Sequence, residues 1–140
     1  MKIINLEINE LTEKVIIKNA ALSINSTHRY KINNQFRDGL DWSSTTLLDP
    51  FGEISSITIN ELLIEKKWST IDLLKIDIEG AEAEIFRSNV DFLEKTRIIA
   101  LEVHEEFISH IEIESILKKF GFIVFYSGEL TIGINKYLLA

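Results

Sequence analysis

Ile71-Asp-Leu-Leu-Lys-Ile-Asp-Ile-Glu-Gly-Ala-Glu82 is the stretch of sequence that decides the fold. Its strand-forming part alternates: the apolar side chains at positions 74, 76 and 78 share one face, and Lys75, Asp77 and Glu79 share the other. At a rise of about 3.3 Å per residue, the two carboxylates stand roughly 7 Å apart on an otherwise apolar, central strand. Gly80 then permits a sharp turn, and a helix-forming segment follows it. The stretch therefore predicts the strand–turn–helix corner at which open α/β sheets bind ligands.

A second strand with polar residues at its end is predicted further along the chain. Arg97-Ile-Ile-Ala-Leu-Glu-Val-His104 is apolar until Glu102 and His104 appear on one face. The segment from Ala81 to Lys95 is long enough for a helical crossover between two parallel neighbouring strands. Because the ends of such strands meet at the same edge of a sheet, the sequence predicts one polar cluster there, made of Lys75, Asp77, Glu79, Glu102 and His104.

The same residues carry a resemblance to a known family. Lys75-Ile-Asp-Ile-Glu-Gly-Ala-Glu82 and the later Glu-Val-His104 resemble the FkbM-type family of S-adenosylmethionine-dependent methyltransferases, in which a K-[IV]-D-[IV]-E-G-x-E turn precedes a strand ending in E-x-H. Asn19-Ala-Ala-Leu-Ser23, Ile57-Thr-Ile-Asn-Glu-Leu62 and Lys119-Phe-Gly-Phe122 are similar to other elements of that family, in the same order. The resemblance runs from about Asn5 to Ala140 and implies an α/β fold, a Rossmann-like class I methyltransferase sheet with flanking helices and an antiparallel C-terminal hairpin.

The resemblance also exposes a gap in the sequence. The family begins with a strand and a glycine-rich loop for the methionine part of the cofactor, followed by a strand that ends in an acid for the ribose. Neither pattern occurs here, since the six glycines never form G-x-G-x-x-G after an apolar strand. We therefore expect residues 1–140 to form a single, partial FkbM-like domain, the C-terminal two-thirds of the family fold. Its strand at 15–22 and its strand at 71–79 would flank an absent central strand, so association of copies through an exposed sheet edge, or aggregation, is expected.

The resemblance implies roles for the predicted cluster. The acceptor would be a hydroxyl on a sugar or polyketide-like small molecule, with S-adenosylmethionine as cofactor. His104 would be the base, because an imidazole exchanges a proton near neutral pH, and Glu102 would orient it or bind substrate. Asp77 and Glu79 would bind acceptor hydroxyls or, together with Glu102 and His104, a divalent cation; no metal site is predicted. Lys75 would pair with the carboxylates.

Structural interpretations of these residues stay open beside the functional ones. His104 is also explained as a strand-end histidine bonded to backbone, and Lys75 with Asp77 as a structural ion pair. By resemblance, the end of the strand at 15–22 approaches the adenine ring, which makes Asn19, Ala20 and Ala21 candidates for cofactor binding. Small residues at a strand end are otherwise explained by packing.

Composition restricts the class of protein further. A net charge of −7 and the lack of a basic patch argue against nucleic acid as a partner. No apolar run is long enough for a membrane helix, and no signal peptide pattern opens the chain, so no membrane partner is expected. The absence of cysteine fits a reducing cytoplasm. Two alternatives to an active methyltransferase remain: a carboxylate- or metal-dependent hydrolase built on Asp77 and Glu79, and a non-catalytic remnant or subunit.

The other elements are predicted from local pattern. We expect a helix remnant over residues 1–13, a short strand over 28–36 and a helix capped by Thr58 or Asn60. The polar segment 37–46, which holds Trp42, is predicted to fold over a site. A helix over 110–120 and strands over 122–126 and 136–140 complete the chain.

Overall fold

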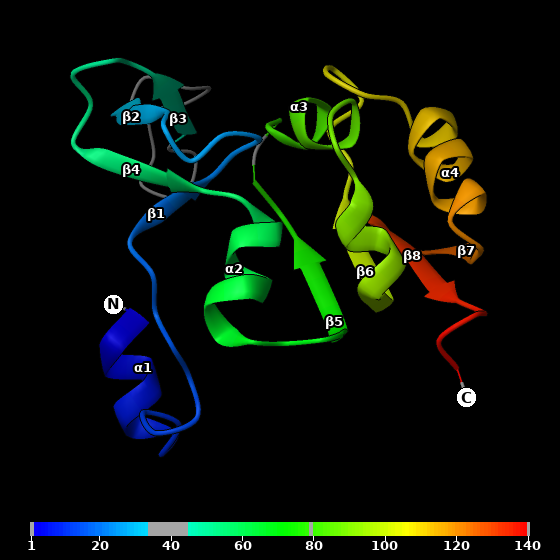
Figure 1. Ribbon diagram of the computed structural model, residues 1–140, viewed down its shortest axis with the longest axis horizontal. Coiled ribbons are helices and arrows are strands. Elements are labelled where there is room, and N and C mark those ends of the chain that lie inside the picture. The colour runs from blue at the N-terminus through cyan, green and yellow to red at the C-terminus, as the bar shows by residue number, and fades with distance from the viewer. Residues whose placement is uncertain (1, 34–44, 79, 140) are drawn as a thin grey trace.

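The computed structural model describes residues 2–33, 45–78 and 80–139 (Figure 1). In chain order the elements are α1 (Lys2–Ile8), β1 (Ala20–Leu22), β2 (Arg29–Asn33), β3 (Thr45–Leu48), β4 (Ile54–Ile57), α2 (Ile59–Lys66), β5 (Ile71–Ile76), α3 (Glu82–Phe86), the 3-10 helix η2 (Asp91–Lys95), β6 (Thr96–Glu102), α4 (His110–Lys119), β7 (Phe122–Ser127) and β8 (Leu130–Asn135). Within these ranges, no helix has the length and apolarity needed to span a membrane.

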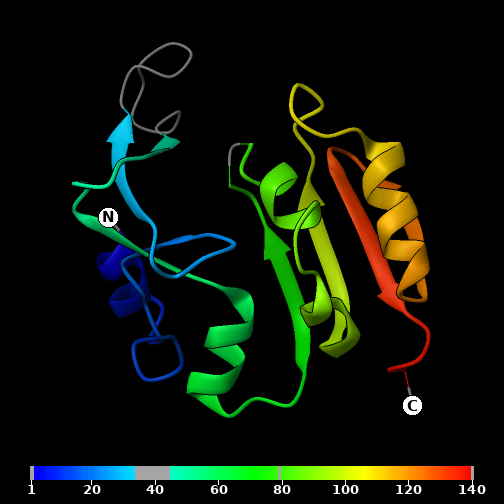
Figure 2. The same cartoon turned by 45° about the horizontal axis from the view of Figure 1, so that its top comes forward.

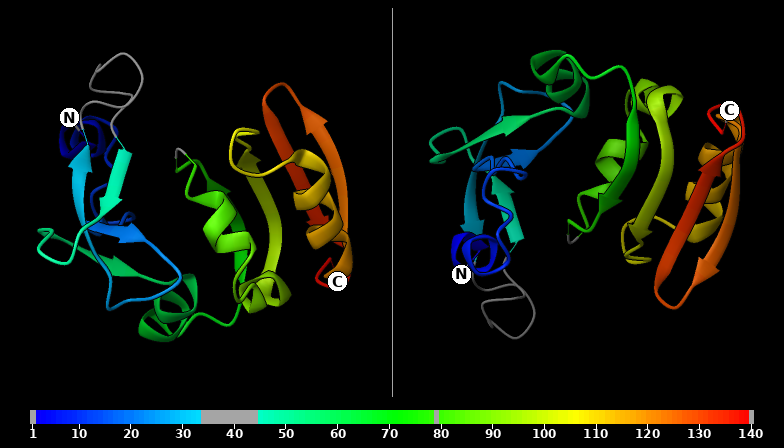
Figure 3. Two further views of the ribbon diagram at one scale, coloured as in Figure 1. Left: turned by 90° about the horizontal axis from the view of Figure 1, so that it is seen from above. Right: turned by 90° about the horizontal axis from the view of Figure 1, so that it is seen from below.

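The strands form two mixed sheets that lie side by side and are joined by α2 (Figures 1 and 3). One sheet has the order β1-β4-β2-β3 and the other has the order β5-β6-β8-β7. The predicted α/β class is confirmed. A continuous Rossmann-like sheet is not formed by the described strands, because β1 and β5 each lie at the edge of a separate sheet. The prediction that the strand beginning at Ile71 is central was therefore wrong.

The predicted parallel pair of strands is confirmed. β5 and β6 run parallel, with Leu74 opposite Ile99 and Ile76 opposite Leu101. The crossover between them is not the single helix that was expected, since α3 is short and η2 follows it. Side chains compete with the helix here: the Ser88 hydroxyl donates to the Ile85 carbonyl, and the Asn89 side-chain oxygen accepts from the backbone N–H of Asp91.

The predicted antiparallel hairpin is confirmed, but with a different second strand. β7 pairs with β8 across a tight turn that contains Gly128, whose φ is +60°. Residues 136–139, which were predicted to be a strand, follow β8 instead. β8 ends at Asn135, which is buried and donates from its side chain to the Leu93 carbonyl while accepting from the backbone N–H of Tyr137. β8 also pairs with β6, which leaves β7 at the sheet edge.

The strands of the N-terminal sheet differ from those that the sequence pattern indicated. The strand predicted over 15–22 is restricted to Ala20–Leu22, because its parallel partner β4 offers only Ser55 to Ile57 for pairing. Residues 15–19 are exposed and lie outside any strand. The helix near the N-terminus and the strand within 28–36 are confirmed as α1 and β2, whereas β3 and β4 were not predicted. Trp42, placed by prediction in a loop over a site, lies outside the described residues.

Two helices begin at side-chain caps, of which the one at Thr58 was predicted. Thr58 begins α2 as predicted: its hydroxyl accepts from the backbone N–H of Glu61, whose carboxylate accepts from the backbone N–H of Thr58. Ser109 caps α4 in the same way through the backbone N–H of Glu112. α4 packs against β7, the edge strand of the C-terminal sheet (Figure 2).

The hydrophobic core lies mainly in the C-terminal half of the chain. It joins the inner faces of β5 and β6 to α2, α3, η2 and α4. Its fully buried members are Ile76, Leu93, Ile99, Leu101, Ile108, Ile113 and Leu117. This core fixes the ends of β5 and β6, where the predicted polar residues lie.

Candidate functional site

The turn between β5 and α3 depends on Gly80. Its φ of +95° is a conformation that L side chains rarely adopt. A Cβ atom at this position would also lie 2.5 Å from Cε2 of Phe107. The segment after β6 therefore packs its aromatic ring directly against the glycine of the β5–α3 turn. The contact joins the turn after β5 to the segment after β6.

Lys75 and Asp77 form an ion pair at this corner. The Lys75 ammonium lies 2.6 Å from Oδ2 of Asp77. Both side chains are substantially exposed. The predicted pairing of Lys75 with a carboxylate is thus confirmed for Asp77. Water screens the pair, so it does not impose the desolvation cost expected for a central strand.

A second pair, between His104 and Glu82, is buried. Nδ1 of His104 lies 3.0 Å from Oε1 of Glu82, and the side chains are 9% and 0% exposed. The same Glu82 oxygen accepts from the backbone N–H of Ile78 at 3.3 Å. The other oxygen, Oε2, is buried without a hydrogen-bond partner among the described residues. Glu82 therefore connects the turn after β5 to the residue just beyond β6.

Glu82 was not among the residues predicted for the cluster. It ends the quoted motif, where an acid is also explained by the preference of helix N-termini for negative charge. The spacing of Gly80 and Glu82 could have indicated this contact. A tight turn at Gly80 brings Glu82, the first residue of α3, back towards the end of the strand.

The remaining members of the predicted cluster are only partly described. Glu102 is the last residue of β6 and is half-buried, one position beyond the last β5–β6 pair, Ile76 with Leu101. Glu79 lies outside the described residues. Of the predicted cluster, the structure thus places Lys75 and Asp77 in an exposed pair after β5, and it places His104 in a buried pair with Glu82, a residue that was not predicted. No three described His, Asp or Glu side chains gather as a metal site.

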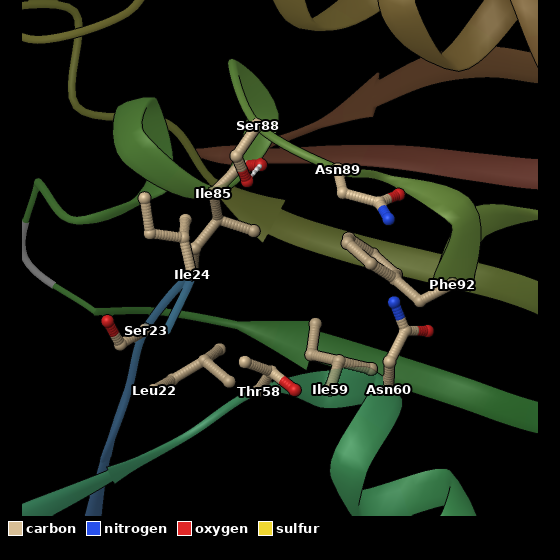
Figure 4. A pocket seen from close by; sticks show the side chains of 10 residues that line it. All are labelled: Leu22, Ser23, Ile24, Thr58, Ile59, Asn60, Ile85, Ser88, Asn89 and Phe92. Carbon is tan, nitrogen blue, oxygen red and sulfur yellow. Dashed lines mark hydrogen bonds between the residues drawn. The ribbon is translucent and has the colours of Figure 1, made fainter. Parts of the chain in front are cut away.

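A pocket of about 270 Å³ lies where the end of β1 approaches α2, α3 and η2 (Figure 4). Apolar side chains and uncharged polar side chains line it together: Leu22, Ser23, Ile24, Thr58, Ile59, Asn60, Ile85, Ser88, Asn89 and Phe92. None of these residues is charged. A flat, uncharged heteroaromatic ring fits this combination, because the apolar groups contact its faces and the amides pair with its edge.

The wall of the pocket at β1 is held by a side-chain network. Tyr30 donates its hydroxyl to Oγ of Ser23 at 2.9 Å, and Nδ1 of His28 lies 3.1 Å from the same atom. The predicted cofactor residues Asn19, Ala20 and Ala21 lie immediately before this wall. Ala20 and Ala21 are half-buried in β1, and Asn19 is exposed.

Comparison with known proteins gives one match. Residues 5–124 match the family model described as the methyltransferase FkbM domain. No curated protein and no solved structure matches the chain.

Proposed function

The chain belongs to the FkbM methyltransferase domain family, and from this premise we propose that it methylates a hydroxyl group on a sugar or polyketide-like small molecule. The family implies the use of S-adenosylmethionine, which supplies a methyl group carried on a sulfonium. Transfer of that methyl to an alcohol releases the hydroxyl proton, so the chain must position the acceptor and provide a base.

The observation that carries the proposal is the position of His104. It lies just beyond β6 at the β5–α3 corner, and its imidazole is held in place by the 3.0 Å contact with Glu82. An imidazole accepts and releases a proton near neutral pH, which is the task of a base in alkylation of a hydroxyl. We assign Asp77, Glu79 and Glu102 to binding of the acceptor, whose hydroxyl groups donate hydrogen bonds to carboxylates.

For the adenine part of the cofactor we propose the pocket at the end of β1. Ile59, Ile85 and Phe92 offer apolar contacts to a ring, and Asn60 and Asn89 offer amide donors and acceptors. Asn19, Ala20 and Ala21 stay predicted cofactor residues next to its wall. The lining residues include no acid for the ribose hydroxyls, so the chemistry of this pocket matches the base of the nucleoside rather than its sugar.

A non-catalytic subunit is the second candidate function. It is favoured by the open edges of the two sheets, because Leu73 of β5 is 61% exposed and the apolar residues Ile16 and Ile17 before β1 are also exposed. We propose that such edges let copies of the chain associate, since unpaired strands readily pair with other strands. Sedimentation equilibrium would test this association, because it measures whether the mass in solution is that of one chain or of several.

A cytoplasmic location stays a prediction.

The test of the proposed activity is transfer of a trideuterated methyl group from labelled S-adenosylmethionine to a panel of methyl glycosides and hydroxylated macrolactones, followed by mass spectrometry. His104→Gln should lower kcat by about 10²–10⁴-fold, the usual contribution of a general base. His110→Gln is the matched control, because His110 lies on α4 and contacts Thr131; its rate should match that of the wild type.

Failure of the folded wild-type chain to label any member of the panel while retaining cofactor binding would contradict the acceptor class. Hydrolysis of the panel without cofactor, stopped by a chelator, would instead support the hydrolase built on Asp77 and Glu79.

A further inference from the structure

We propose that Glu82 is a positioning residue for His104: it keeps the imidazole proton on Nδ1 and so presents Nε2 as the proton-accepting nitrogen. This inference rests on the proposed function only where it says what Nε2 is for. The position of the proton concerns the side chains of Glu82 and His104 and does not depend on methyl transfer.

In this proposal the direction of the hydrogen bond follows from the chemistry of a carboxylate. Glu82 as a carboxylate has no proton to donate, so Nδ1 of His104 is the donor in the 3.0 Å contact. A neutral imidazole has one N–H, and Nε2 then holds the lone pair. The backbone N–H of Ile78 donates to the same Glu82 oxygen, which fixes the carboxylate at the turn and limits its rotation.

Burial shows that this carboxylate is held at a cost. Glu82 is fully buried, and its Oε2 has no hydrogen-bond partner among the described residues. Leaving a buried polar oxygen unpaired is destabilising, and closing the Ile78 turn requires only one neutral acceptor. A charged acceptor is useful at this place because it also stabilises the imidazolium that forms when His104 takes a proton.

The other two histidines provide an internal comparison. Nδ1 of His28 contacts the hydroxyl of Ser23, and Nδ1 of His110 contacts the hydroxyl of Thr131. A hydroxyl can donate or accept, so neither contact fixes the position of the imidazole proton. Within the described residues, His104 is the histidine that has a carboxylate at Nδ1.

The experiment is long-range ¹H–¹⁵N correlation of the imidazole rings at a pH where they are neutral, with peaks assigned by His28→Gln, His104→Gln and His110→Gln. In the wild type, His104 should be mainly the Nδ1–H form. Glu82→Met, which has similar length and no acceptor of comparable strength, should shift His104 several-fold towards Nε2–H. Glu82→Gln should retain Nδ1–H, because its side-chain oxygen still accepts. The forms of His28 and His110 should not change in either variant.

A wild-type His104 protonated on Nε2, or a Glu82→Met variant that keeps the Nδ1–H form, would overturn the proposal. If Glu82→Met does not fold, Glu82→Asp serves the same test, since it keeps the charge but is one methylene too short to reach Nδ1. The measurement uses neither cofactor nor acceptor, so loss of the proposed methyl transfer would leave its result unchanged.

A kinetic readout follows once a panel member is methylated. Glu82→Met should lower kcat at least about 10-fold, and by no more than the 10²–10⁴-fold that a general base contributes, without changing the KM for S-adenosylmethionine. In the His104→Gln background the same change should have no further effect. An equal loss in both backgrounds would overturn the positioning role.

Discussion

Replacement of Gly80 by alanine tests how the β5–α3 corner is held. Two costs add at this position. A non-glycine residue with φ of +95° pays about 1–2 kcal/mol for its backbone conformation. The new Cβ also meets the Phe107 ring at 2.5 Å, which is an overpacked contact that costs about 1–3 kcal/mol. The sum is about 2–5 kcal/mol of unfolding free energy, a large part of the 5–15 kcal/mol that holds a typical domain together.

Gly128→Ala provides the matched control. Gly128 also has a positive φ, +60°, but apart from its chain neighbours no atom of the described residues lies within 4 Å of a Cβ built there. Its replacement should therefore cost only the backbone part, about 1–2 kcal/mol. Removing the ring with Phe107→Ala should bring the cost of Gly80→Ala down towards that of Gly128→Ala, because the clash is gone while the backbone strain remains.

The assay is urea denaturation followed by far-ultraviolet circular dichroism on the four variants and the wild type. The difference between the two glycine variants isolates the packing cost, and the double variant assigns it to Phe107. If Gly80→Ala costs no more than Gly128→Ala, or if loss of the ring brings no relief, the corner is not held by this contact and the reasoning is refuted.

Three further predictions concern stability. Thr58→Ala should cost about 1 kcal/mol by removing the cap of α2, and urea titration should show it; an unchanged midpoint would contradict the capping role. Leu101→Ala, in the fully buried centre of β6, should cost about 2–5 kcal/mol in the same assay, and a cost below 1 kcal/mol would mean that the core is not packed as described. The Arg87 guanidinium, hydrogen-bonded to Glu112, holds the pKa of that carboxyl below its ordinary value. A carboxyl with a lowered pKa in the folded state stabilises the fold above its unfolded pKa, and this contribution is lost as the pH falls through the folded value. The wild type should therefore melt at a higher temperature than Glu112→Gln near neutral pH, and this difference in Tm should shrink as the pH falls below about 4. A difference in Tm that does not change with pH would contradict the ion pair.

The sequence predicted the C-terminal half of the fold better than the N-terminal half, for a physical reason. β5 and β6 each carry apolar residues that are buried in the core, such as Ile76, Ile99 and Leu101, and this burial decides where the two strands lie. The segment before β1 also carries apolar residues, Ile16 and Ile17, but it pairs with no strand of the described part of the chain. Local pattern indicates that a segment can form a strand, and only the rest of the chain decides whether it does.

In the candidate site, too, local sequence patterns were predictive and contacts between distant residues were not. His104 and Asp77 were predicted as candidates because each follows an apolar strand, which is a local signal. Glu82 was not predicted, because its contact with His104 depends on the turn of the chain at Gly80 and on the residue that follows β6. The end of β8 was also misplaced, since Asn135 stops the strand through a contact with the distant Leu93 carbonyl. Contacts between residues far apart in sequence leave no local pattern.

The central claim, that the chain binds the methyl donor of its family, is tested most directly by isothermal titration calorimetry of the folded 140-residue chain with S-adenosylhomocysteine. We expect the chain to bind S-adenosylhomocysteine saturably at one site with micromolar affinity. No heat of binding from a chain that unfolds cooperatively would contradict it and would favour the non-catalytic subunit.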